Sequence, residues 1–520
     1  MSVQKTRSLT PIPVLTLLAF CWPFMNFLNV NQSMLGAPQV MSVATYLGLC
    51  LAAVLSLWIL LIVTRVPRRI RLGLDASLAI SVALFFAFPI LMNLIASALA
   101  ILGQSSGGFI VYGALLALAF AVMFWVGRVE NARSFFLVFL LIATALPTAR
   151  YILFEVRQFV TSVTSDTSGQ APVGARFDLT PDVFFLIMDS YPRNDTLKQF
   201  FDHDDSEFLD ALRARGFIVN EDFNANYPST FLSLSSVLEM DYVATPEEIF
   251  ENRDPYIAAI VGSGRVQEHF RSAGYLIAHG SYKVTAGGCQ GNEDYCVDKG
   301  LGATFGEIEY GILSLTPIAA LLSRAQFLGL PPQTLDQYIN AVSSVPLQDD
   351  VFYFIHSNPP HPPFFLTEDC IDGAVSSIEA TESDPTMKTA FAHSVDCSGQ
   401  GAIKLIDHVL SENPDALIIL QSDHGSSSTV DWTVPAVQWS EEQAEERLAS
   451  LSAIRAPARC EETVKGLRSS VNTFRVVIAC LENRQPDLLA DRYFLNTYEN
   501  VSDFGQVREV FPRPRAEIEW

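Results

Sequence analysis

Three things are scarce or missing in this sequence, and the first two each argue against a class of protein. No two cysteines have Cys-x-x-Cys spacing, which argues against a zinc site built from thiolates. Basic residues are outnumbered, with 34 Lys and Arg against 56 Asp and Glu, so the chain is a poor candidate for binding nucleic acid. Acidic residues are almost absent from the first 160 positions, which hold three of them beside ten Lys and Arg.

The first third of the chain is apolar instead. Five stretches, each near the ~20 residues that cross a bilayer, fall at roughly 11–30, 42–64, 75–101, 108–127 and 134–153. The mean hydropathy of +0.26 is high for a soluble enzyme. We expect the first stretch to be retained rather than cleaved, because four more follow it. The sequence therefore predicts a transmembrane domain of five spans over 1–155, a linker over 156–180 and a soluble domain over 181–520.

The charge of the loops predicts the orientation of these spans. The loops at about 31–41 and 102–107 contain no Lys or Arg, whereas the alternate loops contain several. Because positive loops stay in the cytoplasm, the amino terminus is expected there. With five spans, the soluble domain then lies on the extracytoplasmic, or periplasmic, side of a bacterial cytoplasmic (inner) membrane.

The cysteines agree with an oxidising compartment. The soluble part holds an even number of them, which is typical of disulfide-bonded extracytoplasmic proteins. Nearest-neighbour pairing is one of several possibilities. The candidates are Cys289, Cys296, Cys370, Cys397, Cys460 and Cys480.

Three apolar runs in the soluble part end in polar residues. The run Ala416–Gly425 reads Ala-Leu-Ile-Ile-Leu-Gln-Ser-Asp-His-Gly and predicts a strand buried on both faces, with Gly425 allowing a sharp turn. The runs 181–189 and 350–356 are similar and end at Asp189 and His356. Helical patterns alternate with them at 195–215, 256–273 and 400–412. This order predicts an α/β domain with a largely parallel sheet flanked by helices.

Chemically distinctive residues follow these strands, where α/β sheets collect their sites. Asp189, Asp423 and His424 are ligand types for a divalent metal. Thr230 follows Ser229 at a probable helix start, where a hydroxyl either caps the helix or attacks a phosphate ester. The segment His-Ser-Asn-Pro-Pro-His places His361 between prolines, either as a plain loop residue or as a rigidly held catalytic one.

Taken in order, these motifs resemble the alkaline phosphatase/sulfatase superfamily. They are most similar to its membrane-anchored transferases, which include lipoteichoic acid synthases and phosphoethanolamine and phosphoglycerol transferases. The resemblance implies five amino-terminal spans, an extracytoplasmic catalytic domain of alkaline phosphatase-like fold, and one divalent metal ion (Mn, Zn or Mg). It implies that Asp189, Thr230, Asp423 and His424 hold the metal, that Thr230 is the nucleophile and that His361 contacts the substrate.

Departures from the family pattern narrow this expectation. No cysteine lies between positions 51 and 288, which argues against a sulfatase-type formylglycine made from cysteine. Asp189 is followed by Ser190 rather than a second acid, which favours one firmly held metal. No histidine follows His424, unlike several phosphoethanolamine transferases. Arg447 and Arg475 are weaker candidates for contacting an anionic substrate, as is His356, and a structural salt bridge is the plainer role for each arginine.

The sequence therefore predicts an integral membrane enzyme that moves a phospholipid headgroup, of phosphoglycerol or phosphoethanolamine type, to an envelope glycan or lipid through a phosphothreonine intermediate. A phosphodiesterase, phosphatase or other ester hydrolase on the same site is one alternative. A catalytically inactive membrane scaffold is another.

Overall fold

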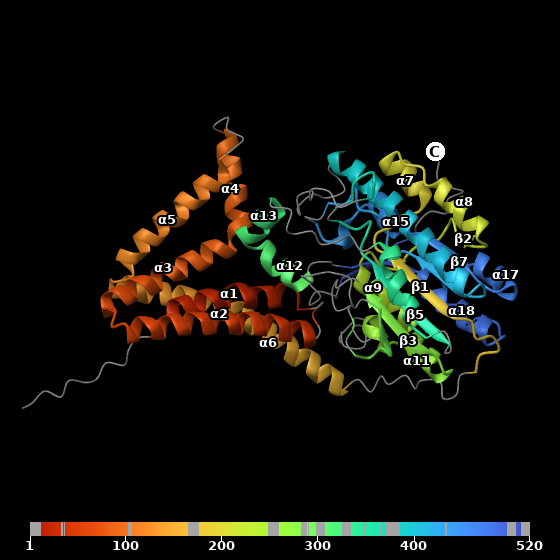
Figure 1. Cartoon of the computed structure of the whole chain (residues 1–520), viewed down its shortest axis with the longest axis horizontal. Coiled ribbons are helices and arrows are strands. Elements are labelled where there is room, and N and C mark those ends of the chain that lie inside the picture. The colour runs from red at the N-terminus through yellow and green to blue at the C-terminus, as the bar shows by residue number, and fades with distance from the viewer. Residues whose placement is uncertain are drawn as a thin grey trace, which may run out of the picture. The chain divides into compact units, whose positions relative to one another are not determined.

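The structure is a computed structural model of the whole chain (Figure 1). It describes residues 12–32, 35, 37–101, 107–164, 176–247, 259–281, 289, 291–297, 307–324, 334–346, 350–362, 364, 366–370, 385–431, 434–496 and 506–510. The chain forms two compact units. Unit 1 comprises Met1–Arg157 and Glu307–Leu328, and unit 2 comprises Gln158–Gly306 and Gly329–Trp520.

Unit 1 is helical, as the apolar stretches predict. Among its described residues, three helices, in α2, α5 and α6, are long and apolar enough to cross a membrane. The pair α3 and α4, bent by 73°, makes a fourth span if it is counted as one. The first expected span is a shorter helix, and the number of spans stays a prediction. The described helices are α1 (Val14–Val30), α2 (Ala37–Val63), α3 (Arg68–Phe86), α4 (Phe88–Ile101), α5 (Gly108–Val126), α6 (Glu130–Thr164), α12 (Glu307–Ser314) and α13 (Pro317–Arg324).

A buried acid ties three of these helices together. Asp75 of α3 is fully buried and pairs with Arg133 of α6 at 2.7 Å between Oδ2 and Nη2. Its Oδ1 accepts hydrogen bonds from the backbone amide and the hydroxyl of Thr16 in α1. A charge inside an apolar bundle needs such partners, because no water is there to solvate it.

Unit 2 contains a seven-stranded sheet in the order β2-β7-β6-β1-β5-β3-β4. The pairs that join β6, β1, β5, β3 and β4 are parallel, and those that join β2, β7 and β6 are antiparallel. A separate antiparallel pair joins β8 to β9. The bounds are β1 Val183–Met188, β2 Ile218–Val219, β3 Leu276–Ser281, β4 Tyr295–Cys296, β5 Val351–Ser357, β6 Leu417–Gln421, β7 Ser452–Arg455, β8 Tyr493–Asn496 and β9 Val507–Val510.

Helices cover both faces of this sheet (Figure 1). Alternate residues of β1 enter two different cores, with Phe185 packed among α9, α11 and α18 and Leu186 among α7, α8 and α15. This is why the central strands are apolar without interruption. The α-helices are α7 Asn194–Phe201, α8 Ser206–Ala214, α9 Thr230–Glu239, α11 Arg265–Ser272, α14 Ile339–Ser343, α15 Pro385–Glu412, α16 Glu441–Leu448, α17 Glu461–Lys465 and α18 Thr473–Leu481. Shorter turns are η1 Ala259–Ser263, η2 Leu335–Tyr338, η3 Ala436–Gln438, η4 Ala458–Cys460 and η5 Ser470–Asn472.

The fold class predicted from the sequence is confirmed: a helical membrane-type unit accompanies an α/β unit with a mainly parallel sheet. The three predicted strands are β1, β5 and β6. Helix α6 runs to Thr164, so its last turns occupy part of the expected linker. The six cysteines of the sheet unit join as nearest neighbours, Cys289–Cys296, Cys370–Cys397 and Cys460–Cys480.

Candidate metal and phosphate site

Three adjacent strands end at the same edge of the sheet and bring their polar residues together. Strand β1 lies between β5 and β6, and Ile187 of β1 is in register with both His356 and Gln421. Asp189 follows β1 directly, while Asp423 and His424 follow β6. The sequence predicted this meeting point because parallel strands share their carboxyl edge.

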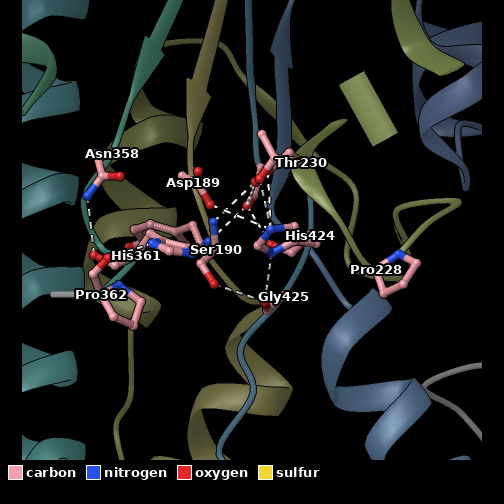
Figure 2. Close-up of polar contacts among 12 residues, drawn as sticks. Asp189, Ser190, Pro228, Thr230, Asn358, His361, Pro362, His424 and Gly425 are labelled. Carbon is pink, nitrogen blue, oxygen red and sulfur yellow. Dashed lines mark hydrogen bonds and ion pairs between the residues drawn. The ribbon is translucent and has the colours of Figure 1, made fainter. Parts of the chain in front are cut away.

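The side chains converge on His424 (Figure 2). Its Nε2 lies 3.2 Å from Thr230 Oγ1, 3.3 Å from Asp423 Oδ2 and 3.6 Å from Asp189 Oδ1. The other Asp189 oxygen lies 3.2 Å from His356 Nε2. The two aspartates and both histidines are buried, whereas Thr230 is partly exposed. Partial exposure of Thr230 is what a nucleophile that meets a substrate requires.

Thr230 is the first residue of α9, and Ser229 is the residue that precedes the helix. The Ser229 side chain makes no capping hydrogen bond. The amides of the first turn of α9 therefore keep their capacity to bind an anion near the Thr230 hydroxyl.

The cluster fits a divalent cation. Asp189 Oδ1 and Asp423 Oδ2 are buried and accept no hydrogen bond from the described residues. Buried carboxylates without donors are costly unless a cation or a proton neutralises them. His424 Nε2 lies 3.2–3.6 Å from Thr230 Oγ1, Asp423 Oδ2 and Asp189 Oδ1. A tetrahedral zinc with bonds of about 2.0–2.1 Å separates its ligand atoms by about 3.3 Å.

The protonation of the cluster also favours a metal. Burial alone would raise the pKa of Asp189, but the neighbouring His361, His356 and His424 hold it well below its ordinary value. Burial, and then the positive charge of Arg447, lower the pKa of His424 to about 4. His424 Nδ1 donates to the carbonyl of Gly425, so the lone pair of the neutral imidazole is on Nε2, inside the cluster.

Arg447 of α16 reaches into the same cluster. It is 2% exposed, and its Nη2 lies 3.0 Å from His424 Nε2. It also donates to the carbonyls of Pro228 and Gly425. The guanidinium thus holds the chain before Thr230 and the loop after His424, and it places a fixed positive charge beside the site.

Glu446, the residue before Arg447, holds the loop that follows His424. Its carboxylate accepts hydrogen bonds from Ser426 Oγ and from the amides of Ser428 and Thr429. The role of Gly425 differs from the sharp turn expected, since its φ is not positive. An added Cβ there would lie 2.3 Å from the Glu446 carbonyl oxygen, so glycine permits close packing on α16.

The other candidates differ in position. The ring centroid of His361 lies 6.4 Å from that of His424, and its Nδ1 donates to the carbonyl of Pro362 (Figure 2). Arg475 instead donates to the carbonyls of Met240 and Asp487, which lie outside this cluster. Its expected role in binding substrate finds no support in this geometry.

Ser190 is a residue of this cluster that was not predicted from the sequence. Its backbone amide donates to Asp423 Oδ1, and its hydroxyl donates to the carbonyl of Gly425. It has a positive φ of 66°, which is uncommon outside glycine. No sequence pattern around Ser190 predicts this backbone turn after β1.

No protein-family model and no curated protein matches the chain. Among solved structures, it is similar to the C-terminal periplasmic domain of EcEptC from Escherichia coli, with 12% identity and TM-score 0.38 over 62% of this chain and 93% of that one. It is also similar to the phosphonate monoester hydrolase of Agrobacterium radiobacter, with 14% identity and TM-score 0.36 over 61% and 80%. A third is the periplasmic domain of the phosphoethanolamine transferase EptC from Campylobacter jejuni, with 10% identity and TM-score 0.36 over 59% and 91%. Similarity at this level assigns no activity, which the site itself has to support.

Proposed function

We propose that the protein is a membrane-anchored, metal-dependent phosphotransferase that moves a phospholipid headgroup through a phosphothreonine at Thr230. The observation that carries this proposal is the position of the Thr230 hydroxyl, at the amino terminus of α9 and 3.2 Å from His424 Nε2 in a cluster of buried carboxylates.

The metal would be held by Asp189, Asp423 and His424 together with the oxygen of Thr230. When bound, a divalent ion lowers the pKa of the threonine hydroxyl and screens charge on the phosphate. Mixed oxygen and nitrogen ligands admit Mn, Zn or Mg. To free its lone pair for the metal, His424 must release Arg447.

The charge of the site favours a phosphodiester. Two ionised aspartates, one divalent ion and Arg447 leave about one positive charge, which balances the single negative charge of a diester. A phosphomonoester dianion is matched less well. A sulfate ester is also a monoanion, but threonine stands where a sulfatase requires its modified cysteine.

In the first step, Thr230 Oγ1 attacks phosphorus and releases its proton to solvent, and the bond from phosphorus to the diacylglycerol oxygen breaks. The leaving alkoxide takes up a proton, for which the partly exposed His361 is our candidate donor. In the second step, an acceptor hydroxyl on an envelope glycan or lipid attacks the phosphothreonine and gives its proton to His361. The bond from phosphorus to Thr230 Oγ1 breaks, and the Thr230 alkoxide takes up a proton from solvent. Arg447 and the first-turn amides of α9 hold the phosphoryl oxygens throughout.

The test uses the full chain in vesicles that contain a phospholipid with a labelled headgroup. We expect label on the peptide that contains Thr230, detectable by mass spectrometry, and its loss in Thr230→Ala. Label on Ser229, or turnover that survives Thr230→Ala, would refute the proposed nucleophile. An acceptor glycan should raise label release from the enzyme, whereas release that depends on water alone identifies a hydrolase.

A further inference from the structure

Two short helices interrupt the sequence of the sheet unit. Helices α12 and α13 lie in the chain between β4 and η2. Between Glu309 and Arg324 there is no Asp, Glu, Lys or Arg, although this part of the chain is otherwise strongly acidic. An apolar run of this length is too short to span a bilayer and is typical of buried or interfacial segments.

The two helices pack on unit 1, not on the sheet. Ile308 of α12 is 9% exposed and belongs to an apolar cluster with residues of α1 and α2. Gly311 lies against Phe27, since an added Cβ would be 3.0 Å from its ring. Ala320 of α13 packs on a second cluster formed by residues of α4 and α5. Besides Ile308, the residues that form the buried part of these two clusters are Phe24, Leu28, Leu35, Val43, Phe88, Ile95 and Tyr112.

These contacts lie at one end of the spans. Leu28 and Leu35 flank the connection from α1 to α2, and Tyr112 is in the first turns of α5. Both connections, 31–36 and 102–107, fall in the loops without Lys or Arg, which the charge rule places outside the cytoplasm. The helices α12 and α13 therefore sit at the extracytoplasmic ends of the spans.

The other side of α13 carries apolar side chains that the described chain covers only in part. Ile318 is 38% exposed and Leu321 is 54% exposed. Residues three apart project from the same side of a helix. At the ends of membrane spans, such a pair is positioned to meet lipid.

We propose that α12 and α13 form an interfacial hairpin in the extracytoplasmic headgroup layer, with Ile318 and Leu321 at the acyl boundary. The chain enters unit 1 at Glu307 and leaves it at Leu328, so the sheet unit is tied to the bilayer at a second point besides α6. A second tie restricts the distance between the site and lipid substrates, which raises their effective concentration.

The membrane position is tested on the full chain in vesicles, with Cys21 and Cys50 replaced by alanine and a fluorophore at Leu321→Cys. The matched control carries the label at Glu462→Cys on α17, where the native carboxylate side chain is 90% exposed. We expect a quencher on the lipid to act on position 321 and iodide in water to act on position 462. Equal quenching of both positions by iodide would overturn the proposal.

A second experiment measures turnover and rests on the proposed function. In Ile318→Asp with Leu321→Asp, turnover of phospholipid in vesicles should fall at least about tenfold, because both apolar side chains at the acyl boundary become charged. Turnover of a small soluble phosphodiester should be unchanged. Leu488→Asp, at a 51% exposed position of unit 2, is the control and should match the wild type.

The outcomes separate the two ideas. If the double variant loses both activities or neither, the hairpin does not act by presenting lipid, and this inference fails. If the wild type turns over neither substrate, the proposed function fails, and the quenching experiment alone decides whether α12 and α13 lie in the membrane.

Discussion

At the scale of single residues, Arg447 has two opposite effects on the site. Its Nη2 lies 3.0 Å from His424 Nε2, whose lone pair a metal needs, so it opposes metal binding. Its charge, however, suits a bound phosphate. Arg447→Met should therefore bind the metal at least about tenfold more tightly, or about 1.4 kcal/mol, and turn over a phosphodiester more slowly. Competition against a fluorescent chelator measures the first effect, and steady-state kinetics measures the second.

Arg447→Lys keeps the positive charge but not the fork of donors, so its metal affinity should stay closer to that of the wild type. A variant that merely misfolds would lose both metal affinity and turnover. Parallel losses in Arg447→Met, with a lowered melting temperature, would contradict the two opposite effects of this arginine.

A second residue makes stability depend on pH. Burial raises the pKa of Asp205 to about 7, although its carboxylate accepts a hydrogen bond from the Tyr191 hydroxyl. Because the folded state holds this proton more tightly than the unfolded state, Asp205 lowers stability as pH rises from about 4 to about 7. In Asp205→Asn, the loss of stability of unit 2 between pH 5 and pH 8 should shrink by about 2–3 kcal/mol.

Thermal unfolding of the full chain, followed by near-ultraviolet circular dichroism at both pH values, measures this change. Asp210→Asn, at an exposed position on α8, serves as the control. The same pH dependence in Asp205→Asn and the wild type would show that the carboxyl is ionised in the folded protein at pH 5.

At the scale of elements, the corner between β6 and α16 decides whether the site forms. A Cβ on Gly425 would meet two backbone oxygens, that of Glu446 at 2.3 Å and that of Ala449 at 2.5 Å. Neither can move without shifting α16, which also carries Arg447. Gly425→Ala should therefore cost about 2 kcal/mol and abolish metal binding. Gly466→Ala, where the nearest atom is 3.5 Å away, should be tolerated. Calorimetry with metal measures both the stability and the metal binding. Normal metal binding by Gly425→Ala would show that α16 moves freely.

The packing of α1, α3 and α6 depends on one buried pair. Asp75→Asn keeps an acceptor for Thr16 but leaves Arg133 without its counter-charge. Removing one partner of a buried ion pair should cost about 3 kcal/mol. Unfolding in detergent, followed by helical circular dichroism, measures it. The double variant Asp75→Asn with Arg133→Gln should recover part of the loss, and no recovery would mean that the charge pair is not the cause.

At the scale of the whole molecule, charge, apolar residues and cysteines are divided between the two units in a way that fits two environments. The three disulfides lie in the acidic part, and Cys21 and Cys50 in the apolar part are unpaired. Thiol titration of the denatured, unreduced full chain from the native membrane should find two free thiols. Finding eight would place the sheet unit in a reducing compartment.

Patterns within short stretches of sequence were enough to predict the fold class, the central strands and the residues at their ends. The apolar runs mark buried strands, and parallel strands share one edge, so Asp189 and Asp423 had to lie near each other. The apolar, weakly charged first third marked the membrane helices for the same reason, since hydrophobicity is a local property of the chain.

Only the tertiary structure decided which distant faces meet. It brought Arg447 onto His424 and left Arg475 outside the cluster, although both were equal candidates in the sequence. It explained Gly425 by close packing on α16, and it grouped α12 and α13 with unit 1. Contacts between residues far apart in the chain depend on the packing of whole elements, and no local pattern encodes that packing.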